Sequence, residues 1–588
     1  MSIYRHRGLK WLAVVFILAV GLSSGGMLHA QVEAPSQEET TPQSTGELKT
    51  VAVIAVAPYE KLIADITMLG TLAGKPEAGQ MIEGGLSFFT QGKGVQAIDK
   101  SKPWGVIVQT DGASFLPVGC LPITKVKDLL DVATNYGAQV KEGDDVTEVV
   151  MPNQKSMFVK PNGGWAFISV SSAALDRLPE EPQKILAELV TDYDVTARIS
   201  VKDVPEMYRQ FAVQAMQSGM HQQMQKKEGE SDDTFEIRKG MAEAQMEQAV
   251  RTINEVDSIT LGWAVDAAQQ RTYLDFTYEF LAGSKMAEQI AAYGEPTTKF
   301  AGFYQPDAAA TMTFVTKADP KLIEADIAQF ETMMSTMRDQ INKQIDESEQ
   351  LEDAEVRESL KAAAGDFIDA FGATIKAGQM DGGAALHLSE DSLSFVGGAL
   401  VKDPAKVESG LKKLEAAAGK KRDPRLTGVE WNAASHAGVN FHTLSVKVPA
   451  DQKAPRKLLG SEANIAIGIG ADSVYLAVGS DNLDAVKKAI DASAAEPDKA
   501  VPPFEFAASL GPIMEAASAQ AEEGSQKQIT EAVAAMLRDE AKGRDHIRAV
   551  GRVVPNGLRY RFEAEEGVLR AMGTAAAEAQ RQALQAQQ

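Results

Sequence analysis

Short runs of alternating apolar and polar residues recur along the chain, separated by stretches with helical spacing. The alternation is clear at residues 273–278 and 558–562, where it predicts strands with one buried side and one solvent-facing side. Short polar turns such as Thr110-Asp111-Gly112 and Pro555-Asn556-Gly557 join successive strands. Strands joined in this way form mainly antiparallel sheets. The pattern predicts an α+β fold, an antiparallel sheet covered by helices.

Four segments of the first half resemble four segments of the second half in the same order. Residues 51–66, 113–130, 165–178 and 259–280 match residues 311–327, 393–411, 473–486 and 547–566. In the third pair WAFISVSSAALDRL aligns with SVYLAVGSDNLDAV without a gap, so Leu175 corresponds to Leu483. Matches in register order indicate a duplication. We expect two homologous copies, at residues 50–297 and 298–588, with both leucines buried on equivalent helices.

Each copy also contains longer stretches with helical spacing. Isoleucine, phenylalanine and methionine recur every three or four residues from Ile323 to Ile341, like the seam of a coiled coil. The spacing resumes at residues 360–371 after an acidic break. In the first copy, residues 205–225 and 235–256 flank a polar tip. We expect two helical hairpins, which either pack on the sheets or project as arms for self-association or a partner.

Residues 1–30 have the three-part layout of a secretory signal. A basic start precedes an apolar run at residues 11–22, and small residues lead to Ala30. The run is shorter than the roughly 20 residues that a membrane-spanning helix needs. We expect export with cleavage after Ala30, and retention as an amino-terminal anchor is the alternative. Residues 31–49 are polar and predict a disordered tether.

The formal net charge is −22, and removal of residues 1–30 would take away three positive charges and leave −25. Binding to nucleic-acid phosphates needs clustered lysine and arginine. No such cluster follows the signal, so we expect no nucleic-acid partner. No later segment is apolar for long enough to span a membrane, so we expect an extracytoplasmic chain, periplasmic or secreted. Cys120 is the only cysteine, which excludes a disulfide within the chain.

One helical stretch has the side chains of a copper site. Met216, Met220 and Met224 recur on one predicted helical face, with His221 beside them. Thioethers and imidazole suit Cu(I). Methionine also fills gaps in helical cores, and the chain has 21 methionines. We therefore expect packing and no copper.

Two further patterns resemble zinc or calcium sites. His436 and His442 flank a predicted turn and would face each other across a hairpin, but two imidazoles without a third ligand make a poor zinc site. The acidic loops at residues 142–145 and 228–233 lack the ligand spacing of a calcium-binding loop. We expect no metal at either place.

The sequence contains no recognised catalytic motif. The Gly-x-Gly of residues 467–473 lacks a third glycine and runs into a strand, so it predicts a hairpin turn and no dinucleotide site. Cys120 lies in an apolar strand, which predicts a buried and unreactive thiol. We therefore assign no catalytic, cofactor-binding or metal-binding residue.

The signal, the polar tether and the four repeated segments together resemble a large group of exported proteins of planctomycete-type bacteria. This resemblance implies an exported α+β protein with a duplicated body and implies no activity. We expect a non-catalytic, extracytoplasmic binding or scaffolding protein, with a ligand held in a groove between the copies. An envelope hydrolase whose site forms no sequence motif is the alternative.

Overall fold

The structure is a computed structural model of the chain. It describes residues 46–90, 95–223, 225–226, 230, 232–318, 324–349, 351–421 and 426–585. The predicted signal lies outside these residues, as does the predicted tether up to residue 45. The described residues form helices and antiparallel strands, which confirms the α+β class.

The chain forms two compact units, which we describe separately. Unit 1 comprises residues 46–71, 75–211 and 257–267, and unit 2 comprises residues 72–74, 212–256 and 268–585. The predicted division into copies between residues 297 and 298 stays a prediction.

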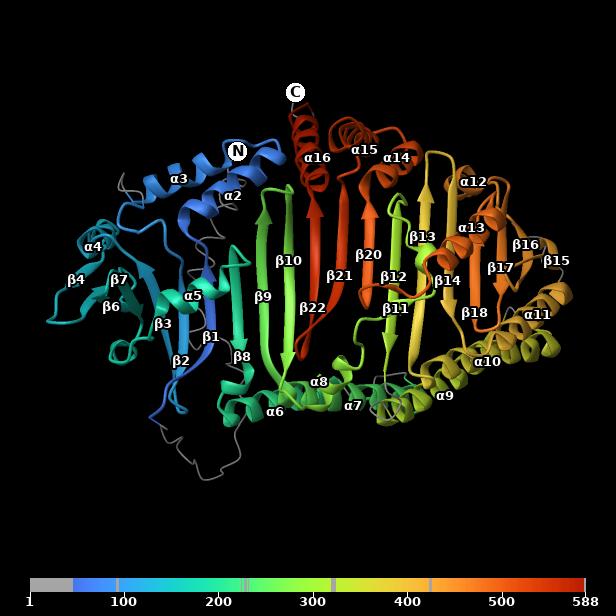
Figure 1. Cartoon of the computed structure of the whole chain (residues 1–588), viewed down its shortest axis with the longest axis horizontal. Coiled ribbons are helices and arrows are strands. Elements are labelled where there is room, and N and C mark those ends of the chain that lie inside the picture. The colour runs from blue at the N-terminus through green and yellow to red at the C-terminus, as the bar shows by residue number, and fades with distance from the viewer. Residues whose placement is uncertain are drawn as a thin grey trace. The chain divides into compact units, whose positions relative to one another are not determined.

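The described residues of unit 1 contain nine strands in one antiparallel sheet, in the order β9-β8-β1-β2-β3-β7-β6-β5-β4 (Figure 1). The strands are β1 (Lys49–Val56), β2 (Trp104–Thr110), β3 (Phe115–Pro122), β4 (Gln139–Lys141), β5 (Thr147–Val150), β6 (Ser156–Asn162), β7 (Trp165–Ser169), β8 (Val195–Ser200) and β9 (Val256–Asp266). The helices are α2 (Tyr59–Leu72), α3 (Ala78–Phe89), α4 (Val126–Asn135), η1 (Ser172–Leu175), α5 (Pro182–Leu189) and η2 (Val201–Asp203), followed by α6 (Glu206–Gln223), which continues into unit 2.

Two helices cover different faces of the unit 1 sheet. The helix α5 crosses β1 and β2, and its Leu186 packs with Val53, Ile107 and Val118 in the main core of the unit. The helix α4 covers the opposite face at the end of the sheet formed by β4 to β7, where it packs against Val159. Both faces of this sheet are therefore partly buried.

The described residues of unit 2 contain eleven strands in one antiparallel sheet, in the order β10-β22-β21-β20-β12-β13-β14-β18-β17-β16-β15. The strands are β10 (Arg271–Phe280), β12 (Ala310–Lys317), β13 (Gln379–Leu388), β14 (Leu393–Leu400), β15 (Leu426–His436), β16 (Val439–Lys447), β17 (Glu462–Ile469), β18 (Ser473–Val478), β20 (Phe504–Ser509), β21 (His546–Val554) and β22 (Gly557–Glu565). A separate short pair is formed by β11 (Thr297–Thr298) and β19 (Lys499–Ala500).

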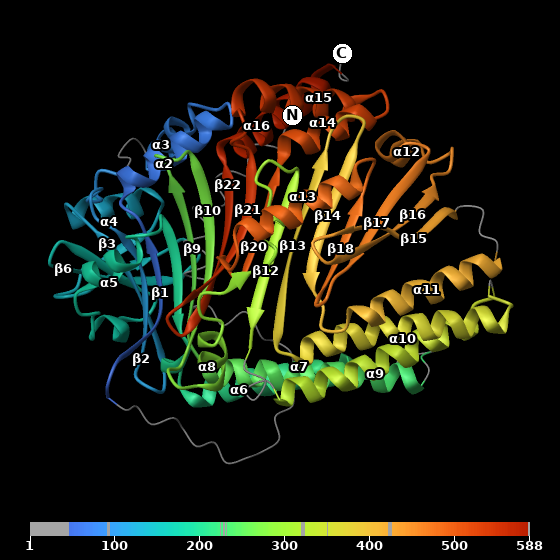
Figure 2. The ribbon, with the colours of Figure 1, turned by 45° about the vertical axis from the view of Figure 1, so that its right-hand side comes forward.

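Most helices of unit 2 lie at the ends of its strands. The helices α9 (Glu324–Glu347), α10 (Ala354–Lys376) and α11 (Pro404–Lys421) run across one end, and α14 (Leu510–Gln520), α15 (Ser525–Met536) and α16 (Glu566–Gln585) lie at the other (Figure 2). The remaining helices are α7 (Asp232–Glu255), α8 (Lys285–Ala291), η3 (Ala301–Phe303), α12 (Lys453–Leu459), α13 (Asn482–Ala495) and η4 (Leu537–Ala541).

The main core of unit 2 lies on one face of the sheet. There η3 and α13 pack Phe300, Phe303 and Val486 against Phe441 and Val396 of the strands. The prediction that helices cover the sheet therefore holds for part of this face and, at the end formed by β15 and β16, for part of the other face, where α11 contacts Trp431. The helices α14 and α16, which begin at the residue after β20 and β22, stay near the strand ends.

The helices of the two predicted hairpins are confirmed. In the second pair, the Phe330 and Phe371 rings lie 5.7 Å apart and join α9 to α10. The first pair is α6 and α7, although part of its polar tip lies outside the described residues. Ile323, the first residue of the predicted seam, also lies outside them.

The two corresponding leucines differ in burial. Leu175 is fully buried at the end of η1, as expected, but Leu483 is only half-buried in the first turn of α13. The prediction that both are buried is therefore wrong for Leu483. Val486 and Ile490, one and two turns later, occupy the buried positions of α13.

We expect Leu175→Ala to lower the free energy of unfolding of unit 1 by about 2–5 kcal/mol, because a fully buried leucine leaves a cavity. Leu483→Ala should cost clearly less, since solvent already reaches that side chain. Urea denaturation of the full chain, followed by circular dichroism, measures both losses. Equal losses would contradict the difference in packing.

Candidate functional site

The sheet of unit 2 has an apolar face. Residues that pair across neighbouring strands lie on the same face of the sheet. A row of residues paired in this way therefore follows one face from strand to strand. We define the apolar face by three rows across nine strands: Thr272, Ala564, Ile547, Ala508, Ala310, Leu386, Phe395, Val478 and Ile465; Leu274, Phe562, Ala549, Phe506, Met312, Ala384, Gly397, Leu476 and Ile467; and Phe276, Tyr560, Gly551, Phe504, Phe314, Gly382, Ala399, Val474 and Ile469. These rows contain no charged residue.

Burial on β10 and β22 is the reverse of what the sequence pattern predicts. The apolar side chains Phe276 and Phe562 are 38% and 52% exposed, whereas Asp275 and Glu563, on the opposite face, are 1% and 8% exposed. The predicted division into one buried and one solvent-facing side therefore holds for these strands, but the buried side is the polar one. Alternation gives two unlike faces, and only the surrounding structure decides which face meets water.

The buried polar face is stable because its charges are paired. Arg561 donates hydrogen bonds from Nε and Nη2 to the two carboxylate oxygens of Asp275, each at 2.8 Å. Its guanidinium carbon also lies 3.8 Å from the centre of the Tyr273 ring. Arg271 donates from Nη1 to Glu563 at 2.8 Å. A buried carboxylate needs such partners, so these two ion pairs allow Asp275 and Glu563 to be buried.

The apolar face ends at β16, where α11 lies over the sheet. His442 packs its ring 4.6 Å from that of Trp431, whose Nε1 donates to Glu415 of α11 at 2.7 Å. Nδ1 of His442 accepts from the backbone N–H of Asn432 at 3.1 Å, which places the proton of the neutral ring on Nε2. Burial lowers the pKa of His442 and keeps the ring neutral.

The unit 1 sheet also has an apolar face. One row of its register is Leu261, Ala197, Ile54, Val106, Gly119, Ile168 and Val159. Leu261 and the neighbouring Ile199 are exposed, whereas α4 covers the end at Ile168 and Val159. This face is therefore open only over part of its strands.

The structure separates the histidine pair that the sequence suggested as facing partners. His436 pairs with Val439, and its Nε2 lies 2.7 Å from Asp491 of α13. Because His436 pairs with Val439, the two share a face of the sheet. Side chains alternate between faces along a strand, so His442, three residues after Val439 on β16, lies on the other face. The two rings therefore cannot share a metal ion, and the expectation that they face each other is wrong.

The other sequence candidates occupy ordinary structural positions. Met216 and Met220 lie on α6, but Met224 lies outside the described residues. The loop at residues 142–145 is exposed between β4 and β5, and part of the loop at residues 228–233 lies outside the described residues. Within the described residues, no group of three histidine, cysteine or acidic side chains is placed to hold a metal ion.

The predicted burial of Cys120 and the predicted hairpin turn at the Gly-x-Gly stretch are confirmed. Burial raises the pKa of the Cys120 thiol to about 12, so the thiol stays protonated at neutral pH. The glycines at residues 467–473 lie in and beside the hairpin turn between β17 and β18.

One cluster of ionisable side chains, which sequence reasoning missed, lies where β21 begins. The buried Asp545 accepts hydrogen bonds from Ser509 Oγ at 2.9 Å and from the backbone N–H of Gly511 at 2.5 Å, which fixes the start of α14. Next to it, His546 Nδ1 lies 3.0 Å from Glu565 Oε2, and Nε2 lies 3.3 Å from the carbonyl oxygen of Pro306. These contacts tie four segments together, so the cluster is structural.

We expect His546 to make the stability of unit 2 depend on pH. Its hydrogen bond to Glu565 raises the pKa of His546 above its usual value. The stabilisation is therefore fully present below the unfolded-state pKa of about 6.5 and is lost as the pH rises through the folded-state pKa. His546→Gln should destabilise unit 2 more at pH 5.5 than at pH 9, as measured by urea denaturation. A loss that is the same at both pH values would contradict this ion pair.

Comparison of the chain with protein-family models, with curated proteins and with solved structures gave no match. Within the part of the chain that the structure describes, no helix combines the length and the apolar character needed to cross a bilayer.

Proposed function

We propose that the chain is a non-catalytic, extracytoplasmic binding protein that holds uncharged acyl or alkyl chains on the apolar face of unit 2. The carrying observation is the reversed burial on β10 and β22, where the apolar side of the sheet meets solvent and the charged side is enclosed. Export is supported by the layout of residues 1–30, with its basic start, apolar run and small residues before Ala30.

The size of the apolar face argues that it has an occupant. Strands lie about 4.8 Å apart and alternate residues about 6.8 Å apart, so nine strands and three rows span roughly 40 Å by 15–20 Å. The largest apolar patch on a typical soluble monomer is about 300–600 Å² and is often functional. Covering this surface with a hydrocarbon chain removes apolar area from water, which drives binding.

Charge and shape favour a narrow, neutral occupant. The three rows contain no charged side chain, and Thr272 and Tyr560 supply their only side-chain hydrogen-bonding groups. A net charge of −22 disfavours anionic headgroups and a second copy of the chain. The helices α9 to α11 and α14 to α16 at the two ends of the strands, together with α11 over β16, limit the approach of another flat surface. A flexible chain meets no such obstacle.

The proposal includes the internal duplication. The order β9-β8-β1-β2-β3-β7-β6-β5-β4 in unit 1 corresponds strand by strand to β21-β20-β12-β13-β14-β18-β17-β16-β15 in unit 2. The first three pairs of similar segments fall on corresponding strands, β1 with β12, β3 with β14 and β7 with β18, and the fourth pair includes β9 with β21. The partly open apolar face of unit 1 is then a second, smaller copy of the same surface. No observation favours the alternative prediction of an envelope hydrolase, and we assign it no catalytic residues.

Titration with straight-chain alcohols tests the proposed ligand class. We expect octanol, decanol and dodecanol to bind with affinities that rise roughly fourfold for each added methylene, because each buried CH₂ contributes about 0.8 kcal/mol. Displacement of an environment-sensitive fluorescent probe measures these affinities, and sedimentation velocity in the same samples reports self-association. A chain that dimerises and binds no alcohol would show that the face is a contact between copies, and would overturn the proposal.

A further inference from the structure

The hydroxyl groups in the defined rows of the apolar face lie at one end of unit 2. Thr272 and Tyr560 lie on β10 and β22, and Tyr278 lies one row beyond the third, opposite Leu558. Tyr278 is two residues after Phe276, so both side chains lie on the apolar face. On β17, at the other end, the three rows finish in isoleucines: Ile465, Ile467 and Ile469. A bound chain therefore meets two chemically different ends of the face.

Packing fixes the rings of Tyr278 and Tyr560 at this end. A Cβ atom at Gly551 of β21 would lie 3.1 Å from Cε1 of Tyr560, so the Tyr560 ring occupies space that the glycine leaves open. The ring centre of Tyr278 lies 6.2 Å from that of Tyr560. It also lies 5.8 Å from the ring centre of Phe276 and 5.4 Å from that of Phe280. Aromatic rings attract one another at such separations, so the four rings form one cluster.

The hydroxyl groups of Tyr278 and Tyr560 keep hydrogen-bonding capacity for a ligand. Tyr304, which is also partly exposed, donates to a fixed acceptor, Glu505, at 2.8 Å. Tyr278 and Tyr560 are partly exposed as well but hydrogen-bond to each other, and burial together with this bond raises the pKa of Tyr278. Within the described residues neither hydroxyl has a further partner. A bond between two hydroxyls uses one of their two protons, so the pair can still donate one proton and accept others.

The surroundings of the two hydroxyls favour a neutral end group. The charged side chains of β10, β21 and β22, such as Asp275, Arg552 and Arg561, alternate with the apolar ones and lie on the opposite face of the sheet. A carboxylate end would need a cation or several donors when it leaves water, and the tyrosine pair has one spare proton. A hydroxyl end both donates and accepts, so it matches the pair.

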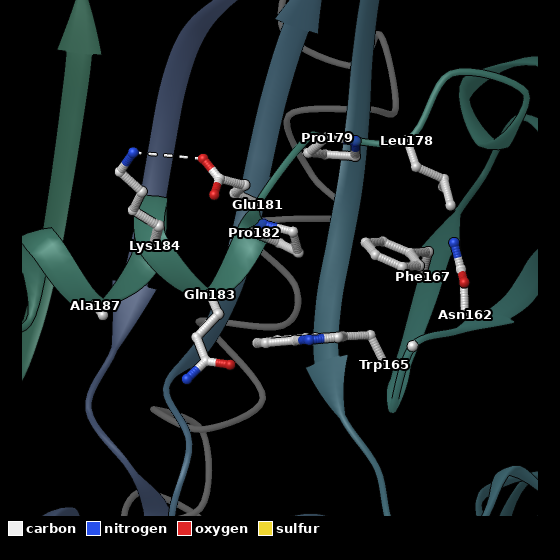
Figure 3. Close-up of a pocket in the computed structure, with 11 residues that line it drawn as sticks. Asn162, Trp165, Phe167, Leu178, Pro179, Glu181, Pro182, Gln183, Lys184 and Ala187 are labelled. Atoms are coloured by element: carbon white, nitrogen blue, oxygen red, sulfur yellow. Dashed lines mark hydrogen bonds and ion pairs between the residues drawn. The ribbon is translucent and has the colours of Figure 1, made fainter.

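The pocket between β7 and α5 of unit 1 offers no comparable surface (Figure 3). It has a volume of about 690 Å³, but the Trp165 and Phe167 rings that line it are 6% and 3% exposed and belong to the core of the unit. Its charged side chains, Glu181 and Lys184, pair with each other at 3.4 Å, as the dashed line in Figure 3 marks. A hydrocarbon chain therefore finds no open aromatic surface in this pocket.

We propose that Tyr278 and Tyr560 hold the hydroxyl end of a long-chain primary alcohol, whose hydrocarbon chain lies across β21 and β20 towards β17. This inference rests on the proposed function, because it needs an alkyl chain on the apolar face. It narrows the ligand class from uncharged chains to chains that end in a hydroxyl group, and it gives the bound chain one orientation. Burial of CH₂ groups supplies the affinity, and the two tyrosines determine which end group is accepted.

Tyr278→Phe and Tyr560→Phe in the full chain test this assignment with decanol and 1-chlorodecane, which have the same chain and differ in the end group. We expect each variant to weaken decanol binding about three- to tenfold, the effect of one hydrogen bond, and to change 1-chlorodecane binding less than about twofold. Displacement of an environment-sensitive fluorescent probe measures both affinities, and circular dichroism checks the fold. Tyr136→Phe, which alters an exposed tyrosine next to α4 in unit 1, is the matched control and should change neither affinity.

Equal weakening of both ligands would show that the tyrosines only pack against the chain, and would overturn the assignment. Decanol affinity that neither tyrosine variant changes, or that Thr272→Val weakens instead, would also overturn it. In these cases an affinity that still rises with each added methylene leaves the proposed function intact. If no alcohol of any length binds, both proposals are wrong.

Discussion

The double replacement of Phe276 and Phe562 by aspartate should weaken dodecanol binding at least about 100-fold while unit 2 stays folded. Both side chains are well exposed, so the new carboxylates remain hydrated in the unliganded protein. Under a hydrocarbon chain they would lose that hydration without gaining a partner. Burial of an unpaired charge has one of the largest free-energy costs in proteins. Displacement of the fluorescent probe measures the loss, and circular dichroism checks the fold.

Met81→Asp is the matched control, because Met81 is also an exposed apolar side chain but lies on α3, away from the apolar face. It should leave dodecanol affinity unchanged. If the double variant binds dodecanol as tightly as the unaltered chain does, the ligand does not lie over β10 and β22, and the proposed site is wrong.

The second large effect is expected from Arg561→Ala, which should destabilise unit 2 by about 3–5 kcal/mol. Asp275 is 1% exposed, and Arg561 donates to both of its carboxylate oxygens. Removal of one member of a buried ion pair has a cost of this size. The loss of contact with the Tyr273 ring adds to it. Urea denaturation of the full chain, followed by circular dichroism, measures the change.

Arg552→Ala serves as the control, since Arg552 is an exposed arginine on the neighbouring strand β21. It should change stability by about 0.5 kcal/mol or less. A loss for Arg561→Ala as small as that of Arg552→Ala would mean that water or another group replaces the guanidinium, and that burial of Asp275 does not depend on Arg561.

The sequence determined local structure well, because that depends on neighbouring residues. Alternation at residues 273–278 and 558–562 marked β10 and β22, and the polar turn before residue 558 marked their antiparallel neighbours β21 and β22. Helical spacing marked both long helical pairs, α6 with α7 and α9 with α10. The apolar context of Cys120 predicted a buried thiol. Each of these inferences rests on turn chemistry or on a periodicity of a few residues.

The sequence did not determine which face of a strand is buried. An alternating strand such as β10 has an apolar and a polar side whatever surrounds it, and burial of the apolar side is the usual outcome. Here Asp275 pairs with Arg561, and Glu563 pairs with Arg271. In both pairs the arginine lies on the neighbouring strand, almost 300 positions away in the sequence. Only the register between β10 and β22 pairs these charges, so only the tertiary structure could place the polar side inside.

The candidate site likewise depends on contacts between residues that are distant in the sequence. The apolar face is built from nine strands spread between residues 271 and 565, and no local pattern shows that their apolar sides align, with Leu274, Phe276, Leu476, Ile547 and Phe562 exposed. Sequence alone fixed the strands, helices and turns, because short-range sterics and periodicity specify them. Strand order, register and the placement of helices at the strand ends decided which side chains meet solvent, because exposure depends on contacts between distant residues.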